Sequence, residues 1–133
     1  MREGWAGDDY LILFEDDESE AASARYALPE WLPGYSLVGL RSWDDFIVHD
    51  QEGNLFTVPT VPAVAKYLES YHLPGKQAWT TDERFRGTIK WYEKPIVFGG
   101  DPSEECVRWV SHDQHAQSVR YWNGVYRRPA ANT

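Results

Sequence analysis

Residues 31–62 constrain the fold most strongly, because three short apolar runs in this stretch are separated by turn residues. The runs are 36–40, 46–48 and 55–58. A glycine lies in the short segment between the last two runs, and two extended runs joined in this way are typical of a β-hairpin. Phe46 and Val48 are expected on one side of their strand and Ile47 on the other, because side chains alternate along a strand. The stretch therefore predicts antiparallel sheet, and it holds no residue set suited to catalysis.

The segments around this stretch predict two helices and a further strand. The apolar run 10–14 has strand length, and residues 4–7, which include two glycines, are predicted to form a loop before it. Residues 18–27 are rich in alanine and glutamate and are predicted to form a helix with a capping box that starts at Asp17. Residues 62–71 are predicted to form a short helix, because a proline suits the first helical position and apolar residues follow at helical spacing.

The second half of the chain is less regular until its last helix. Residues 76–86 lack hydrophobic periodicity and form the predicted linker. Short strands are expected at 88–93, 96–98 and 107–110. Ser111 and Gln114 have the spacing of a capping box, and the residues that follow on one helical face are His115, Val119, Trp122 and Tyr126. A helix over residues 112–127 that ends before Pro129 is therefore expected.

Together these elements predict one α+β domain, residues 1–133, with a mostly antiparallel sheet of five or six strands and packed helices. Residues 1–73 hold the acidic core of strands and hairpin. Residues 74–133 hold the linker, the short strands and the C-terminal helix.

The charge of the chain is negative and unevenly placed, with a formal net charge of −8. Residues 1–73 carry fourteen Asp or Glu against four Lys or Arg, a net charge of −10, whereas residues 74–133 carry seven against nine, a net charge of +2. The first half would repel phosphates, so nucleic acid is not an expected partner. An acidic face instead accelerates the encounter with a basic macromolecule, although net charge also serves solubility.

Several global features predict a cytoplasmic protein that does not interact with a membrane. A single cysteine, Cys106, allows no disulfide within the chain and fits a reducing compartment. No apolar run approaches the ~20 residues that cross a bilayer. The first residues, MREGWAGDD, do not resemble a secretory signal.

Residues near the start of the last helix raise the alternative of a small metal-dependent nuclease or hydrolase that uses Cys106, His112 and His115. Structural zinc sites usually take closely paired ligands from each half of the motif, and one cysteine with two histidines three apart lacks that pattern. Glu104 and Glu105 would raise the pKa of the neighbouring thiol and suppress the reactive thiolate. We therefore expect no enzyme activity, no metal, no other cofactor, and a capping or core role for His115.

The first half of the chain, about residues 5–71, resembles the SUKH superfamily, the bacterial relatives of the yeast Smi/Knr cell-wall regulators. Its members tend to show a strand, acidic residues that open a helix ending in an aromatic residue, and a Pro-Gly step. A strand ending in glycine and a hairpin whose second strand runs into a proline then follow. The matching positions here are 10–14, 15–26, Pro33-Gly34, Gly39, 44–50 and 56–62.

This resemblance implies an immunity protein, which binds and neutralises a toxin, often a nuclease, delivered by neighbouring cells through a type VI or other contact-dependent system. The expected partner is a cognate protein toxin with a basic surface, and a regulatory adaptor is a further alternative. Trp43 is expected to act as an aromatic anchor within a ring of acids. We expect the contact surface to comprise Asp8, Asp9, Asp16, Asp17, Glu18, Trp43, Asp44, Asp45 and Asp50.

Overall fold

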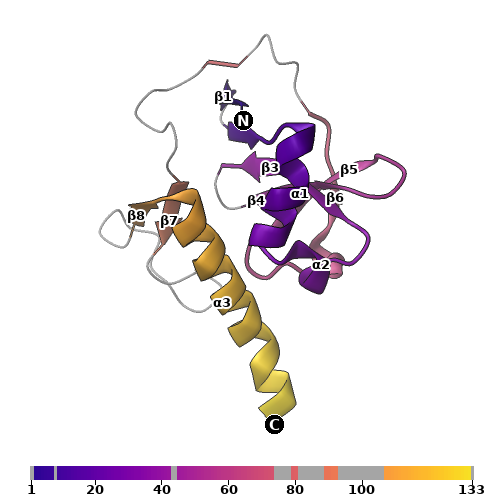
Figure 1. Ribbon diagram of the computed structural model, residues 1–133, viewed down its shortest axis with the longest axis vertical. Helices are drawn as coiled ribbons and strands as arrows, with labels where there is room; N and C mark the ends of the chain where they lie inside the picture. Colours follow the sequence, from indigo (N-terminus) through magenta and orange to yellow (C-terminus); the bar gives the residue numbers. More distant parts are fainter. Residues whose placement is uncertain are drawn as a thin grey trace.

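The main element of the fold is a six-stranded sheet in which each strand pairs antiparallel with the next strand along the chain (Figure 1). The computed structural model describes residues 2–7, 9–42, 45–73, 79–80, 89–92 and 107–132. The strands are β1 (Arg2–Ala6), β2 (Asp9–Leu13), β3 (Ser36–Arg41), β4 (Asp45–His49), β5 (Leu55–Pro59) and β6 (Glu69–Ser70). A second, two-stranded sheet pairs β7 (Ile89–Tyr92) with β8 (Val107–Val110). The predicted α+β fold, with a mostly antiparallel sheet, is confirmed.

The helices connect and cover this sheet. They are α1 (Asp16–Arg25), α2 (Leu28–Trp31), the short 3-10 helix η1 (Ala65–Tyr67) and α3 (His112–Asn132). Helix α1 packs on β3, and the C-terminal end of α3 extends away from the sheet (Figure 1). Among the described residues, no helix combines the length and hydrophobicity that a bilayer-spanning segment needs.

Alternation along the strands gives the sheet a buried cluster on each face. The cluster on the helix side contains Tyr10, Ile12, Phe46 and Val48 from the sheet, with Tyr26, which directly follows α1, Ile89 from β7 and Val119 from α3. The cluster on the other side contains Leu11, Leu13 and Ile47. The prediction that Phe46 and Val48 lie on one face of the strand and Ile47 on the other is confirmed. Because both faces of β2 are buried, its sequence is a continuous apolar run rather than an alternating one.

A tight backbone contact explains the glycine in the middle of β3. The pairing of β3 with β4 shifts register between Leu37 and Gly39, which is a β-bulge. A Cβ atom at Gly39 would lie 2.0 Å from the carbonyl oxygen of Ile12 on the neighbouring β2. Only glycine therefore allows β2 and β3 to approach this closely.

Two capping predictions have opposite outcomes. At α3 the predicted box is present, because the Ser111 N–H donates to Gln114 Oε1 (2.9 Å) and the Gln114 N–H donates to Ser111 Oγ (3.1 Å). At α1 the prediction of a cap at Asp17 and a helix over 18–27 was wrong by two residues. The helix begins at Asp16, after Glu15, whose N–H donates to Glu18 Oε1 (2.8 Å). Every residue from 15 to 18 is acidic, so several positions satisfied the same spacing rule.

The predicted helix over residues 62–71 was also wrong. This segment contains a cis Val61–Pro62 bond, the single turn η1 and the short strand β6, which pairs with β5. Strand β5 takes backbone groups that a helix would have used, because it pairs with Glu69–Ser70 and the Leu55 carbonyl oxygen accepts the Tyr71 N–H (3.0 Å). The N–H of Ala63 donates to the buried Asn123 side chain of α3, whose Nδ2 donates to the Thr60 carbonyl.

Two further boundaries differ from the sequence-based expectation. Residues 4–7 were predicted to form a loop, but most of them belong to β1, where Gly4 lacks a Cβ and lets Thr80 approach its backbone. The last helix was expected to end before Pro129 but continues to Asn132, although a proline inside a helix removes one N–H donor and crowds the carbonyl one turn earlier. The predicted strands at 88–93 and 107–110 correspond to β7 and β8. The predicted strand at 96–98 lies outside the described residues, and so does the predicted linker except for Trp79 and Thr80, of which Thr80 forms an isolated antiparallel bridge with Trp5.

Candidate functional site

The sheet register divides the predicted contact residues between two ends of the sheet. Leu11 pairs with Arg41 and Arg41 pairs with Asp45, so Asp9 and Asp45, at the starts of β2 and β4, lie at the same end. The opposite end carries Asp50, which follows β4, and the first turn of α1 with Asp16, Asp17 and Glu18. Asp8, Trp43 and Asp44 lie outside the described residues. The described members of the predicted surface therefore form two groups.

The carboxylates at the Asp9 end are bonded within the protein. Ser42 Oγ donates to Asp9 Oδ1 (2.8 Å), and Arg41 Nη2 donates to Asp45 Oδ2 (2.8 Å). The Arg41 guanidinium also lies over the ring of Tyr71, 5.4 Å from its centroid. A partner that used Asp9 or Asp45 would have to compete with these contacts.

Two acids at the other end organise their own segments. Asp50 Oδ1 accepts from the N–H groups of Glu52 and Asn54 (both 2.9 Å), which closes the β4–β5 turn. Burial alone would raise the pKa of the Asp50 carboxyl, but the hydrogen bonds from Asn54, Glu52 and Gly53 outweigh it and lower that pKa. Glu18 accepts the Glu15 N–H at the start of α1. Both side chains therefore have structural roles.

The other two described acids of the predicted surface, Asp16 and Asp17, lie on α1 with Glu20, and we call these three residues the α1 ridge. All three side chains are exposed, and within the part of the chain that the structure describes none has a hydrogen bond or ion pair. Their position in the first half of α1 places negative charge at the positive end of the helix dipole. The ridge therefore presents three available carboxylates on one rigid element.

Two serines fix α1 on the sheet and so determine where the ridge points. Ser19 Oγ donates to the Leu37 carbonyl oxygen (2.6 Å), and the Leu37 N–H donates to Ser23 Oγ (2.9 Å). Both backbone groups of Leu37, at the bulge of β3, are thus bonded by side chains one helical turn apart. This pair of bonds prevents rotation of α1 about its axis.

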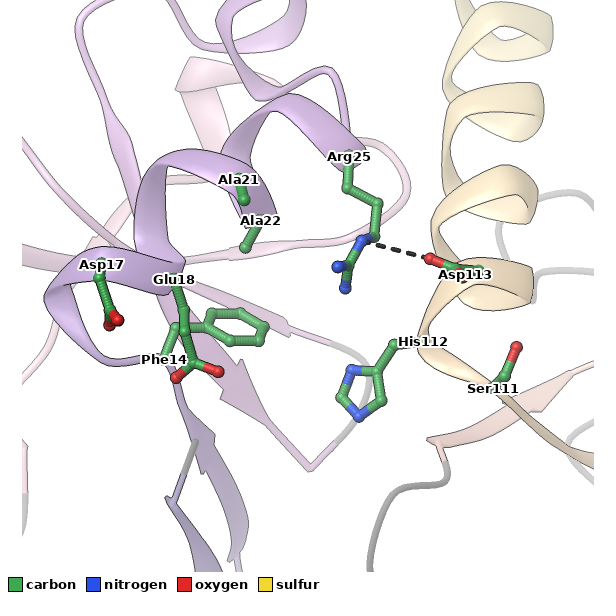
Figure 2. A pocket seen from close by; sticks show the side chains of 9 residues that line it. All are labelled: Phe14, Asp17, Glu18, Ala21, Ala22, Arg25, Ser111, His112 and Asp113. Atoms are coloured by element: carbon green, nitrogen blue, oxygen red, sulfur yellow. Dashed lines mark ion pairs between the residues drawn. The ribbon is translucent and has the colours of Figure 1, made fainter.

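One flank of α1 faces α3 across a cavity of about 450 Å³ (Figure 2). Phe14, Ala21 and Ala22 supply its apolar wall, and Asp17, Glu18, Arg25, Ser111, His112 and Asp113 supply its polar groups. Arg25 Nε lies 3.3 Å from Asp113 Oδ1, and both side chains are partly or mostly exposed, so this ion pair contributes little stability. Figure 2 shows the Arg25 guanidinium between the two helices. This flank therefore contains its own cation.

The opposite flank of α1 faces β3 and the β4–β5 hairpin. Two adjoining cavities of about 600 and 240 Å³ lie there and share Asp16, Ser19 and His49. We call them together the hairpin groove. Its other lining residues are Phe14, Glu20, Ser23, Ala24, Pro29, Tyr35, Ser36, Val38, Gly53 and Leu55. The lining contains two carboxylates and no Lys or Arg.

The histidines proposed as metal ligands have different surroundings. His115 is fully buried, and its Nδ1 lies 2.6 Å from the hydroxyl of Tyr26. Burial, with a smaller contribution from His112, lowers the pKa of His115 to about 3. His112 lines the α1–α3 cavity, and burial followed by the nearby Arg25 charge lowers its pKa as well. The predicted core role of His115 is confirmed.

Cys106, the third proposed ligand, lies outside the described residues. Among the residues that the structure describes, no three His, Cys, Asp or Glu side chains converge in a way that would hold a metal ion.

Sequence reasoning missed Glu20 and His49 as candidate site residues. The spacing of Asp16 and Glu20, four apart in a predicted helix, was a usable signal for two carboxylates on one face. His49 had no comparable signal, because its proximity to α1 depends on how the hairpin and the helix pack.

No family model matches the chain, and searches of curated proteins and of solved structures find no match.

Proposed function

We propose that the protein is a non-catalytic immunity protein that acts in the cytoplasm by binding and neutralising a bacterial protein toxin with a basic surface. The observation that carries this proposal is the α1 ridge, in which three exposed carboxylates have no ion pair among the described residues. The resemblance of residues 5–71 to the SUKH superfamily supports the same proposal, because many bacterial members of that superfamily look like immunity proteins.

Charge gives the ridge a physical role in recognition. A nuclease toxin carries basic groups in the cleft that holds its substrate phosphates. Carboxylates on a rigid helix resemble those phosphates in charge, so they attract the cleft and occupy it. The association rate should therefore be high at low ionic strength and should fall as salt screens the charges.

The internal bonds described above make the ridge a better contact surface than the full set of acids. Asp9, Asp45, Asp50 and Glu18 already accept hydrogen bonds or ion pairs within the fold. Their replacement would change the stability of the protein as well as its binding. The ridge acids can be replaced without removing any such bond.

The test uses the product of the adjacent gene, since immunity proteins are encoded next to their toxins. The wild-type chain should bind that protein in a calorimetric titration and should rescue growth of cells that express it. Neutralising the ridge with Asp16→Asn, Asp17→Asn and Glu20→Gln should weaken binding about 100-fold or more and flatten its salt dependence.

A matched control separates the ridge from overall charge. Glu30→Gln, Glu52→Gln and Glu69→Gln remove the same three charges from exposed positions on α2, the hairpin and β6. This control should bind within a fewfold of wild type. If both triple variants bind equally well, the ridge is not the contact surface; if the wild type neither binds nor rescues, the immunity proposal fails.

A further inference from the structure

We infer that the contact between α1 and the C-terminal unit, which we define as β7, β8 and α3, is an acid-sensitive joint. Acidification increases the fraction of molecules in which the first turns of α3 open away from α1 while the six-stranded sheet stays folded. The inference is carried by two histidines placed inside this contact and by the uncharged groups that fasten α3 further along. It goes beyond the proposed function and does not depend on it.

The two histidines lie at the end of α3 that faces α1. His115 is fully buried, and its Nδ1 atom lies 2.6 Å from the hydroxyl of Tyr26, which directly follows α1. His112, one turn earlier, packs edge-on toward the ring of Phe14, with 6.5 Å between ring centroids. Its Nε2 atom is buried and has no hydrogen-bond partner among the described residues. Both rings therefore fit this contact as neutral imidazoles.

The charged and titratable groups that face these rings do not compensate an added proton. Toward His115 they are the Tyr26 hydroxyl and His112, and toward His112 they are Asp17, Glu18 and Arg25 from α1 and Asp113 from α3 itself. Burial and the Arg25 charge outweigh the acids and lower the pKa of His112. An open contact returns both rings to water, so the open form takes up protons more readily.

The packing beside the rings is loose. A cavity of about 450 Å³, which His112 lines, separates this end of α3 from α1 (Figure 2). The Arg25–Asp113 ion pair also joins the two helices here, but its side chains are partly or mostly exposed, so it adds little. Closure of this end therefore depends on the neutral state of the two imidazoles.

The fastening further along α3 does not titrate. Asn123, two turns beyond His115, accepts the Ala63 N–H and donates to the Thr60 carbonyl oxygen (both 2.8 Å). The pairing of β2 with β3, β4 and β5 likewise consists of backbone hydrogen bonds, which carry no charge. Acid should therefore open the unit from its histidine end, with Asn123 as the pivot, before the sheet unfolds.

His115 alone sets the size of the effect. Its pKa is about 3 in the closed form and returns to 6.5 in the open form, so between pH 7.5 and pH 5 the ratio of open to closed molecules should rise about 30-fold. The closed form is thus fully favoured above pH 6.5 and loses that advantage as the pH falls toward 3. His112 adds in the same direction, because its pKa is lowered as well.

The test is native-state hydrogen exchange of the isotope-labelled wild-type chain, followed by NMR at pH 7.5 and pH 5 with and without low urea. At pH 5 the amides of His115, Ala116 and Val119 should exchange through an opening that depends little on urea, because a local opening exposes little surface. Their protection, corrected for the intrinsic effect of pH on exchange, should be about 30-fold lower than at pH 7.5. The amides of β2 and β4 should keep a higher protection and the steep urea dependence of global unfolding.

Histidine variants locate the titrating groups. His112→Gln and His115→Gln should each reduce the loss of α3 protection between pH 7.5 and pH 5, because glutamine does not titrate. His72→Gln is the matched control, since it removes an exposed imidazole far along the chain from α3 and should leave that loss unchanged.

The wild-type measurement decides the inference even if a variant does not fold. Equal protection and equal urea dependence of the α3 and sheet amides at pH 5 would show that the unit does not open by itself, and protection of α3 that is independent of pH would show that no buried imidazole controls it. An effect of His72→Gln as large as that of His115→Gln would also overturn the inference. None of these readouts involves a toxin, so the joint and the immunity proposal can fail separately.

Discussion

Acid should destabilise this protein well above the pH at which its carboxylates titrate, because of His115. This side chain of α3 is fully buried next to the hydroxyl of Tyr26, and its pKa is lowered to about 3. In the unfolded chain the imidazole regains its ordinary pKa of 6.5. Between these two pH values the unfolded state therefore binds a proton that the folded state does not.

The sign and size of the effect follow from this difference. Because the unfolded state binds more protons, the free energy of unfolding falls as pH drops from 6.5 toward 3, and the stabilisation is fully present above 6.5. One such group should account for about 2 kcal/mol of lost stability between pH 6.5 and pH 5. His112, whose pKa is also lowered, adds in the same direction.

The assay is urea denaturation of the wild type and of His115→Gln at half-unit steps between pH 7.5 and pH 5. Glutamine keeps a polar partner for the Tyr26 hydroxyl but does not titrate. The variant should be less stable at pH 7.5 and should show a clearly shallower pH dependence than the wild type. Equal slopes would refute the reasoning.

A second measurement applies even if the variant does not fold. The imidazole ring signals of His115 in the folded wild type should stay constant in NMR spectra from pH 8 to pH 5. A titration of these signals with a midpoint near the ordinary histidine value would show that the ring is accessible to protons in the folded state, contrary to the structure.

Two further predictions concern stability and are checked by the same denaturation assay at neutral pH. Asn123→Ala should lower the free energy of unfolding by about 2 to 4 kcal/mol, because the Ala63 N–H and the Thr60 carbonyl oxygen would lose their hydrogen bonds to the Asn123 side chain. As a control, replacement of an exposed residue on the same helix, Gln117→Ala, should change the free energy of unfolding by less than about 0.5 kcal/mol. Gly39→Ala should cost about 3 kcal/mol, because its Cβ would overlap the carbonyl oxygen of Ile12, and an unchanged stability would mean that β2 and β3 can separate freely.

Sequence reasoning succeeded where local patterns determine structure. The hairpin was predictable because residues 50–54 carry both the turn glycine and the aspartate whose carboxylate closes the turn. The cap of α3 was predictable because Ser111 and Gln114 satisfy each other's backbone groups, independently of the rest of the fold.

The failures occur where distant residues decide the conformation. Residues 62–71 have helical spacing, but Asn123 and the edge of β5 take their backbone groups. Gly4 suggested a loop, although in β1 it gives room to Thr80. Asn123 and Thr80 lie far from these segments in the sequence, so periodicity alone could not reveal them.

The candidate site was predictable only as a count of charges. The sequence shows that the first half is acidic, but it cannot show that Asp9 bonds Ser42 or that Asp45 bonds Arg41. These contacts depend on strand register, which brings residues 33 positions apart to the same end of the sheet. The available carboxylates are therefore fewer than composition suggests.

The orientation of α1 determines the direction in which the carboxylates of the α1 ridge face a partner. The two serine bonds to Leu37 fix the rotation of the helix, and that rotation sends Asp16 and Glu20 to the hairpin flank and Asp17 to the α3 flank. Arg25 on the α3 flank offsets only one of the three carboxylates that line the cavity there, which are Asp17, Glu18 and Asp113, while the lining on the hairpin flank holds Asp16 and Glu20 and no Lys or Arg. Both flanks of α1 therefore keep a net negative charge, so a basic partner meets an attractive field on either side of the helix.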